Sequence, residues 1–221
     1  MNTEVTADTR AMLHRALGDV ARVLIADALA VSDRTPGELR EVTGATWNLL
    51  AHHLGVLEDA GLVERHRSEG DGRRRYVRLR PGALDHFAHV STLVVRRPLF
   101  VCTHNSARSQ FAAALWRKTT GSDADSAGSH PADRVHPLAV KVARAHGVDL
   151  RASRPRGYNQ VANEPGVVVS VCDRALEARP PFHATTLHWS VPDPSDRDES
   201  AFRWAFADIA ERVQRLARAA A

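Results

Sequence analysis

The feature that most constrains this chain is one short segment, Cys102-Thr103-His104-Asn105-Ser106-Ala107-Arg108-Ser109. An apolar stretch from Pro98 to Val101 precedes it and predicts a strand, and an amphipathic stretch from Ser109 to Thr119 predicts a helix after it. A loop in this place directs successive backbone N–H groups, and the positive end of the helix, at one point in space. The segment therefore predicts a cradle for a tetrahedral oxyanion.

The side chains of the segment suit the same purpose. Arg108 can hold two oxygens of the anion, and the same field should lower the pKa of Cys102 below the usual value of about 8.5. Ser109 can donate its hydroxyl to the thiolate, and Asn105 tolerates an awkward backbone conformation. We expect Cys102 and Arg108 to be catalytic and the anion to contact the rest of the loop, namely Thr103, His104, Asn105, Ser106, Ala107 and Ser109. The plain alternative is a buried cysteine near a chance arginine.

Strands and helices alternate through the rest of the second half. Further strands are predicted at Ala124–Ala127, Val167–Val171 and Thr185–Trp189, and further helices at Pro137–His146 and Ser200–Ala219. Val167–Val171 is wholly apolar, as is typical of a buried parallel strand. The predicted fold class of this half is α/β, with a four-stranded parallel sheet and a phosphate-binding loop.

The first half has a different pattern. Residues 8–60 read as short helices, with Thr35 and Thr46 as helix N-caps. Two strands, Leu62–Arg67 and Arg73–Arg80, flank a glycine-containing turn, and Pro81 begins a closing helix to about Leu93. This order predicts an all-α domain with a winged helix-turn-helix. The expected domains are therefore residues 1–91 and 98–221, joined by a linker at residues 92–97.

The second half resembles the low-molecular-weight phosphatase and arsenate reductase superfamily from about Pro98 to Ala219. Beyond the loop, the resemblance depends on Ser126-Ala127-Gly128-Ser129, His136-Pro137-Leu138-Ala139, Gly147-Val148-Asp149, Arg154-Pro155-Arg156 and Trp189-Ser190-Val191-Pro192-Asp193-Pro194. It implies that Asp193 is the general acid, which protonates the oxygen that leaves when Cys102 attacks. Read without the resemblance, Asp193-Pro194 is an ordinary turn signal.

Phosphate and arsenate have the same shape, so the cradle cannot distinguish a phosphatase from a reductase. A reductase needs a second thiol, and Cys172 follows a predicted strand at the edge of the sheet where Cys102 also lies. The alternative is an inert buried cysteine. Ser195-Asp196 stands where tyrosine phosphatases of the family carry tyrosines, which favours a reductase.

The residues after Cys172 limit which electron donor the chain can use. Thioredoxin-coupled reductases carry a third cysteine there, and residues 173–181 contain none. His104-Asn105 and Ala112-Ala113 resemble the mycothiol-dependent reductases instead. We therefore expect no tightly bound cofactor, and a small thiol such as mycothiol, with its redoxin, that resolves the Cys102 adduct with or without Cys172.

The first half resembles the ArsR-type repressors from about residue 10 to 90, through Ala16-Leu17-Gly18-Asp19 and the run from Leu50 to Val63. The resemblance implies a homodimer that binds operator DNA. Its contacts would come from the start of the recognition helix, at Thr46, Trp47, Asn48, Ala51 and His52, and from the wing, at Arg73, Arg74 and Arg75. This half has no cysteine for arsenite sensing and only scattered histidines, so no metal site is expected. The alternative is a vestigial dimerisation domain with a solvated basic hairpin.

Composition excludes some classes of protein. No apolar run approaches the roughly 20 residues of a membrane span, and two cysteines are too few for a disulfide framework. We therefore expect a cytoplasmic protein without a membrane partner. The rival interpretations are a transcriptional regulator that senses an oxyanion without turnover and a protein tyrosine phosphatase.

Overall fold

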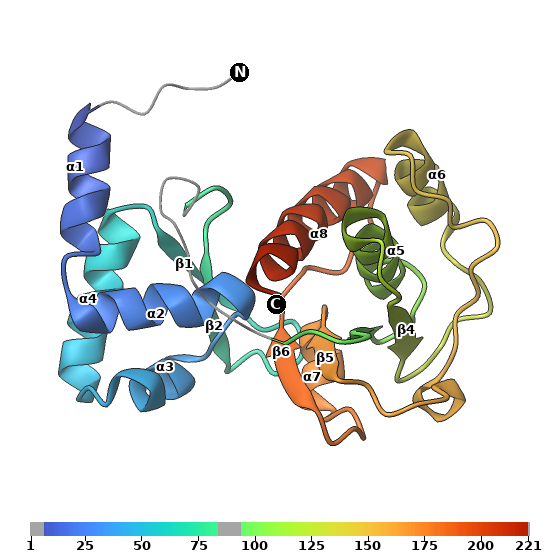
Figure 1. The fold of residues 1–221 in the computed structure, drawn as a ribbon, viewed down its shortest axis with the longest axis horizontal. Coiled ribbons are helices and arrows are strands. Elements are labelled where there is room, and N and C mark those ends of the chain that lie inside the picture. The colour runs from blue at the N-terminus through green and yellow to red at the C-terminus, as the bar shows by residue number, and fades with distance from the viewer. Residues whose placement is uncertain (1–6, 84–93, 221) are drawn as a thin grey trace. The chain divides into compact units, whose positions relative to one another are not determined.

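The computed structural model describes residues 7–83 and 94–220. The chain divides into two compact units, Met1–Arg67 with Arg74–Val90, and Ser68–Arg73 with Ser91–Ala221 (Figure 1). The short segment Ser68–Arg73 thus belongs to the second unit. Each unit has its own arrangement of helices and strands.

The described residues of the first unit form four helices and an antiparallel strand pair. These are α1 (Ala7–Ala16), α2 (Val20–Val31), α3 (Pro36–Thr43), α4 (Trp47–Asp59), β1 (Val63–Arg67) and β2 (Arg75–Leu79). Local caps explain where the helices begin. Asp19 accepts hydrogen bonds from the backbone at the start of α2, Thr35 and Glu38 form a capping box for α3, and Thr46 caps α4.

The core of the first unit is formed by apolar positions at helical spacing, among them Ile25, Leu29, Leu39, Leu54 and Leu57. The predicted helices and hairpin are therefore present. The predicted closing helix lies largely outside the described residues, and Pro81–Ala83 form a turn. The winged-helix type, and the domain boundaries expected from the sequence, stay predictions.

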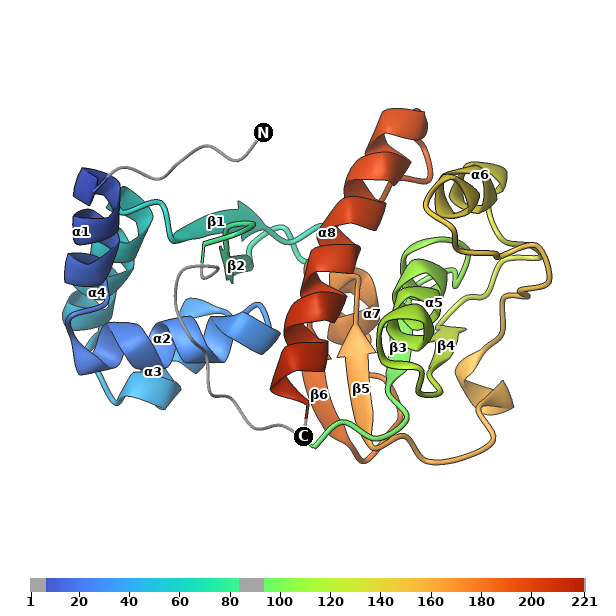
Figure 2. The ribbon, with the colours of Figure 1, turned by 45° about the horizontal axis from the view of Figure 1, so that its top comes forward.

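The second unit is an α/β fold around a four-stranded parallel sheet, as the sequence predicts. Its strands are β3 (Leu99–Cys102), β4 (Asp125–Gly128), β5 (Val167–Ser170) and β6 (Thr185–His188), in the order β4-β3-β5-β6 (Figure 2). Its helices are α5 (Arg108–Thr120), α6 (Pro137–Ala145), the 3-10 helix η1 (Tyr158–Gln160), α7 (Asp173–Glu177) and α8 (Glu199–Ala219). Neither η1 nor α7 was among the elements predicted from the sequence.

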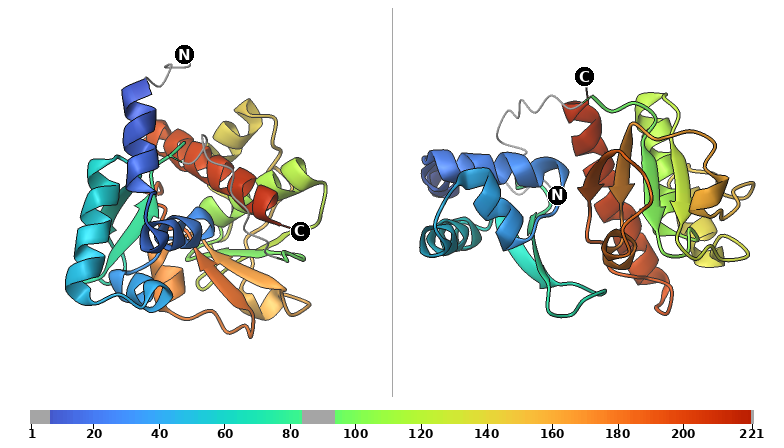
Figure 3. Two further views of the ribbon diagram at one scale, coloured as in Figure 1. Left: turned by 60° about the vertical axis from the view of Figure 1, so that its left-hand side comes forward. Right: turned by 90° about the horizontal axis from the view of Figure 1, so that it is seen from below.

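The helix α5 packs against β3, β4 and the long helix α8, which Figure 3 shows from two further sides. Phe111 of α5 meets Phe206 of α8 edge to face, with ring centroids 5.1 Å apart. The ring of Phe100 in β3 lies between Trp116 and Trp189. These aromatic contacts fix α5, and with it the loop that precedes it, on the sheet.

The register of the sheet determines where the site can form. Val101 pairs with Ser170, and Ser170 pairs with His188. Because the three strands run parallel, their carboxyl ends lie at one edge of the sheet. Cys102 ends β3 there, and Val171 and Trp189 follow β5 and β6. No helix among the described residues is long and apolar enough to cross a membrane.

Candidate active site

The loop from Cys102 to Arg108 joins the end of β3 to the start of α5. The Cys102 thiol is 2% exposed, and its sulfur lies 3.0 Å from Ser109 Oγ. The backbone N–H of Asn105 donates to the same sulfur at 3.2 Å. The loop therefore folds back over its own cysteine, as a backbone cradle for an anion requires.

Asn105 holds the shape of the loop. Its φ of 49° lies in the left-handed region that few residues other than glycine and asparagine adopt. Its Nδ2 donates to Ser109 Oγ at 2.8 Å, and its Oδ1 accepts from Gln110 Nε2 at 3.1 Å and from the Arg156 N–H at 3.0 Å. These bonds offset the cost of the backbone conformation. Gln110 and Arg156 were not among the site residues expected from the sequence.

Gly128, the last residue of β4, lies directly beneath the loop. A Cβ at this position would be 2.6 Å from the Thr103 carbonyl oxygen and 2.9 Å from the Asn105 nitrogen. The next two residues continue the contact, because Ser129 N–H donates to the Cys102 oxygen and His130 N–H to the Thr103 oxygen. Only glycine lets the loop approach the strand this closely.

Arg108 and Asp193 form an ion pair although they are far apart in the sequence. Arg108 is 4% exposed, and its second guanidinium nitrogen donates to the Val191 oxygen at 2.9 Å. Burial raises the pKa of Asp193, but the Arg108 charge and hydrogen bonds from Ser195 outweigh it and hold the pKa below its ordinary value. The loop arginine and the Asp-Pro segment thus meet at one place.

The pKa of Cys102 differs from the sequence expectation. Burial raises the pKa of this thiol above its ordinary value, and the opposing effects of Arg108 and Ser109 are smaller. The expectation of a lowered pKa was therefore wrong. The physical reason is that the thiol is buried, and burial outweighs the opposing charge of Arg108.

Cys172 lies at the same edge of the sheet. It comes after β5, and its sulfur is 3.2 Å from the Thr103 hydroxyl of the loop. The Ser170 hydroxyl donates to the Cys172 carbonyl oxygen at 2.8 Å. Both cysteines are buried free thiols, 2% exposed. The structure therefore brings a second thiol next to the loop that holds the first.

A buried pair supports the chain beside Cys172. His188 Nε2 lies 3.1 Å from Asp173 Oδ1, and both side chains are 4% exposed. Burial raises the pKa of Asp173, but hydrogen bonds from His188, Ser190 and the Glu69 backbone outweigh it and lower the pKa. This pair fixes the start of α7 against the end of β6.

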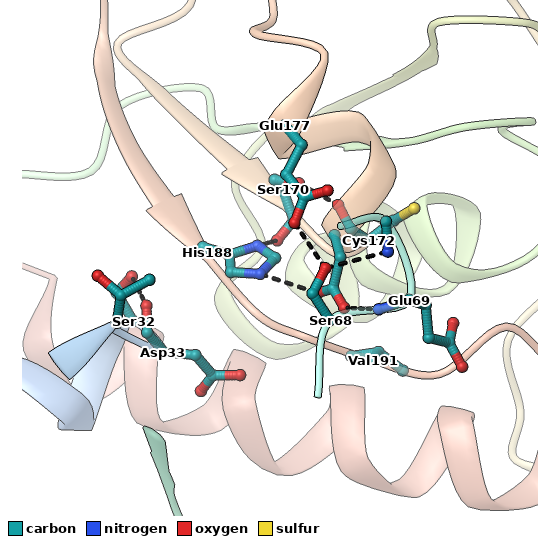
Figure 4. A network of polar contacts seen from close by, with 12 residues as sticks. Ser32, Asp33, Ser68, Glu69, Ser170, Cys172, Glu177, His188 and Val191 are labelled. Atoms are coloured by element: carbon teal, nitrogen blue, oxygen red, sulfur yellow. Dashed lines mark hydrogen bonds and ion pairs between the residues drawn. The ribbon is translucent and has the colours of Figure 1, made fainter. Parts of the chain in front are cut away.

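The segment Ser68–Arg73 also reaches this edge of the second unit, as Figure 4 shows for Ser68 and Glu69. The Glu69 N–H donates to Asp173 Oδ2 at 2.8 Å, and the Glu69 carboxylate accepts from the Asp193 N–H at 2.9 Å. The Ser68 hydroxyl lies 2.5 Å from Glu177 Oε1, and the Asp71 N–H donates to Glu177 Oε2 at 2.6 Å. The sequence predicts this segment only as a turn, and nothing in the sequence indicates that the segment lies at the site.

The residues expected to contact DNA lie on exposed surface. Trp47 is 57% exposed, and Asn48, Ala51 and His52 are exposed beside it on α4, with Thr46 as the cap. Arg40 lies over the Trp47 ring, 5.0 Å from its centroid. Arg73, Arg74 and Arg75 are exposed, and Arg73 pairs with Asp71. In the part of the chain that the structure describes, no three His, Cys, Asp or Glu residues are grouped as a metal would require.

Comparison with known proteins concerns the second half. Residues 97–221 match the sequence model of the low molecular weight phosphotyrosine protein phosphatase family. An arsenate reductase of Bacillus cereus is 31% identical over 124 residues, which is 54% of this chain and 92% of the relative.

Solved structures show the same likeness. The structure of an arsenate reductase from Archaeoglobus fulgidus superposes with a TM-score of 0.50 at 31% identity, covering 55% of this chain and 99% of the other. The tyrosine phosphatase Wzb from Escherichia coli, solved with sulphate, superposes with a TM-score of 0.52 over 57% of this chain and 98% of the other. At 22% identity the second likeness concerns the fold alone.

Proposed function

The chain belongs to the low molecular weight phosphotyrosine protein phosphatase family through residues 97–221, and from this premise we propose that it reduces arsenate to arsenite with Cys102 as the nucleophile. The observation that carries the proposal is the position of Cys172. Its sulfur lies 3.2 Å from the hydroxyl of Thr103, the residue after Cys102. A phosphatase needs one thiol, whereas a reductase needs a second thiol that can reach the first.

Substrate binding changes the partner of Arg108. An arsenate in the cradle takes hydrogen bonds from the loop N–H groups and from the guanidinium. The guanidinium then shares its charge with the anion rather than with Asp193 alone. The pKa of Asp193 rises in consequence, and the carboxyl group becomes able to carry the proton that a leaving oxygen needs.

The first chemical step forms a bond between the Cys102 sulfur and arsenic. Cys102 thiol and H₂AsO₄⁻ give the adduct Cys102–S–AsO₃H⁻ and water. The thiol proton passes to Asp193, and Asp193 delivers it to the departing hydroxyl. In the free protein the raised pKa of Cys102 keeps the thiol protonated and the lowered pKa of Asp193 keeps the carboxylate ionised. The transfer therefore depends on the rise in the pKa of Asp193 that substrate binding brings.

The second step is the reduction. The Cys172 thiol attacks the Cys102 sulfur of the adduct, the S–As bond breaks, and arsenic keeps the electron pair. The adduct and the Cys172 thiol become a Cys102–Cys172 disulfide and H₂AsO₃⁻. Arsenic is reduced from the +5 to the +3 state, and the two sulfurs are oxidised. With only two cysteines in the chain, an external thiol must reduce this disulfide. Mycothiol with its redoxin is the donor that we propose.

One experiment tests this function. The purified protein is incubated with arsenate and either mycothiol with its redoxin, glutathione or thioredoxin, and arsenite is quantified. Parallel samples receive p-nitrophenyl phosphate, and Cys102→Ser is the control for both reactions. We expect arsenite well above the control, and a Cys102–Cys172 disulfide by mass spectrometry after one turnover without reductant. Phosphate release without arsenite would identify a phosphatase instead.

The role of Cys172 is tested separately. Cys172→Ser should stop the reaction at the adduct, so that no arsenite appears in a single turnover without added thiol. Full turnover of this variant at saturating small thiol would show that the external thiol resolves the adduct directly. Ser170→Ala, which changes the neighbour that bonds the Cys172 carbonyl, is the matched control for a simple packing defect.

A second proposed function concerns the first unit, which we infer to be a dimeric DNA-binding domain of the ArsR type. Support comes from the exposed residues Trp47, Asn48, Ala51 and His52 on α4 and from the exposed arginines of the hairpin. A gel-shift assay with the promoter region of its own gene tests it, with Asn48→Ala and Arg75→Ala as variants. Specific DNA binding by a protein that makes no arsenite would favour the pure regulator.

A further inference from the structure

A small pocket lies beside the Asp-Pro segment, and the two proposed reaction steps do not use it. Its volume is about 130 Å³, and its lining residues are Pro192, Asp193, Pro194, Arg197, Ala201 and Trp204. All of them belong to the loop after β6 or to the first turns of α8. The pocket therefore lies wholly within the second unit.

The pocket lies next to the loop from Cys102 to Arg108, which we call the anion loop, because Asp193 lines the pocket and pairs with Arg108. One oxygen of this carboxylate pairs with Arg108, and the other accepts from the Ser195 N–H at 3.1 Å. The cradle itself is closed to large groups, because Cys102 and Arg108 are 2% and 4% exposed. A co-substrate that delivers sulfur to Cys102 must therefore keep the rest of its body outside the cradle, and the pocket is next to it.

The residues that line the pocket determine which chemical groups it can bind. Two prolines and Ala201 are apolar, and the Trp204 indole is 44% exposed. An exposed indole offers a flat face that a sugar or other saturated ring can cover. Arg197 is exposed and adds a cation that binds carboxylates and oxygen-rich groups. At about 130 Å³ the pocket admits one ring or one short side chain.

We propose that this pocket binds the body of the low-molecular-weight thiol that reduces the Cys102–Cys172 disulfide, with a hydroxylated ring against Trp204 or a carboxylate against Arg197. This inference rests on the proposed reductase function and adds the site of its second substrate. The thiol attacks the Cys102 sulfur, the disulfide breaks, and Cys172 leaves as a thiol. A second thiol molecule then attacks the mixed disulfide, which frees Cys102 and releases the oxidised small-molecule disulfide. Two thiols thus supply the two electrons that each arsenate consumes.

Steady-state kinetics with mycothiol and with glutathione test the pocket. Trp204→Ala and Arg197→Ala should each raise the KM for the favoured thiol about ten-fold, the size expected for one lost stacking or charge-assisted contact. Only the KM for the thiol should rise, and the KM for arsenate should stay unchanged. Arg144→Ala removes an exposed arginine elsewhere in the same unit, and it should leave the KM for the thiol unchanged.

A binding measurement tests whether the pocket binds the thiol, independently of turnover. S-methyl mycothiol cannot react, and its titration should quench tryptophan emission in the wild-type protein. The quench should disappear in Trp204→Phe. If mycothiol is the better substrate, the pocket recognises a sugar ring. If glutathione is the better substrate, the pocket recognises a carboxylate.

The two proposals fail in different ways. Absence of arsenite with every donor would overturn the reductase function, whereas the titration would still report on the pocket. Arsenite formation with an unchanged thiol KM in Trp204→Ala and Arg197→Ala would overturn the pocket alone. A change in the KM for the redoxin protein, with none for the small thiol, would also overturn it, because the face would then serve protein docking.

Discussion

The guanidinium of Arg108 pairs with the carboxylate of Asp193, so the two side chains to which we assign roles on the anion bind each other in this structure. The pair links the first residue of α5 to the loop after β6. Asp193 thus faces the guanidinium whose charge favours the Cys102 thiolate, and the pairing lowers the pKa of the Asp193 carboxyl. In the proposed reaction an oxyanion that enters the cradle competes with Asp193 for Arg108, and this competition would couple substrate binding to the protonation of Cys102 and Asp193.

Removal of the Asp193 charge should therefore lower the pKa of Cys102. Asp193→Asn keeps the shape of the side chain and leaves Arg108 without an anionic partner, so the thiolate gains stability. In a Cys172→Ser background, the rate of Cys102 alkylation by iodoacetamide should rise at lower pH than in the same background with Asp193. Asp196→Asn, an exposed neighbour, should leave the profile unchanged. A profile that moves to higher pH would contradict the coupling.

Asn105 should act through both its backbone and its side chain. Asn105→Gly keeps the left-handed conformation and loses the side-chain hydrogen bonds, whereas Asn105→Ala loses both. Both variants should bind phosphate more weakly, and Asn105→Ala should be less stable than Asn105→Gly by about 1 kcal/mol. Urea denaturation and phosphate inhibition of turnover measure the two effects. Equal stability of the two variants would exclude backbone strain, and the exposed Asn163→Ala serves as the control.

Gly128→Ala should displace the anion loop. The new Cβ would lie 2.6 Å from the Thr103 oxygen, so either the loop or the strand must shift, at a cost of about 1–3 kcal/mol. We expect a loss of about five-fold or more in phosphate affinity, since each 1.4 kcal/mol corresponds to about a factor of ten. Gly55→Ala is the matched control, because a Cβ there meets nothing within 4 Å. Unchanged phosphate binding in Gly128→Ala would show that the close contact is unimportant.

The pair of Asp173 and His188 should make stability depend on pH. The folded pKa of Asp173 lies below its unfolded value, so its stabilisation is present above about pH 4 and is lost as the pH falls through the folded pKa. Asp173→Asn should lower the free energy of unfolding by about 1–3 kcal/mol at pH 7, since it leaves buried partners unsatisfied. The difference from the wild-type protein should shrink towards pH 3. Urea denaturation at several pH values measures it, with the exposed Asp123→Asn as the control. A difference that stays constant with pH would contradict this role.

The positions of the elements could be predicted from the sequence because their signals are local. Helix caps such as Thr35 and Thr46 act within one turn, and the apolar run Val167–Val171 indicates a buried strand by itself. The short helices α7 and η1 escaped prediction because neither is long enough to show a helical period.

The sequence by itself determined the loop at Cys102–Ser109, because these eight residues contain the proposed nucleophile, the arginine and the strand-to-helix position that together predict a cradle for an anion. Only the tertiary structure decided which groups surround it. The approach of Gly128, the partner of Asp193 and the place of Glu69 depend on segments that are distant in the chain and meet at one sheet edge. The direction of the Cys102 pKa shift also depends on the tertiary structure. Burial is a property of the packed molecule, and here it outweighs the charge of Arg108.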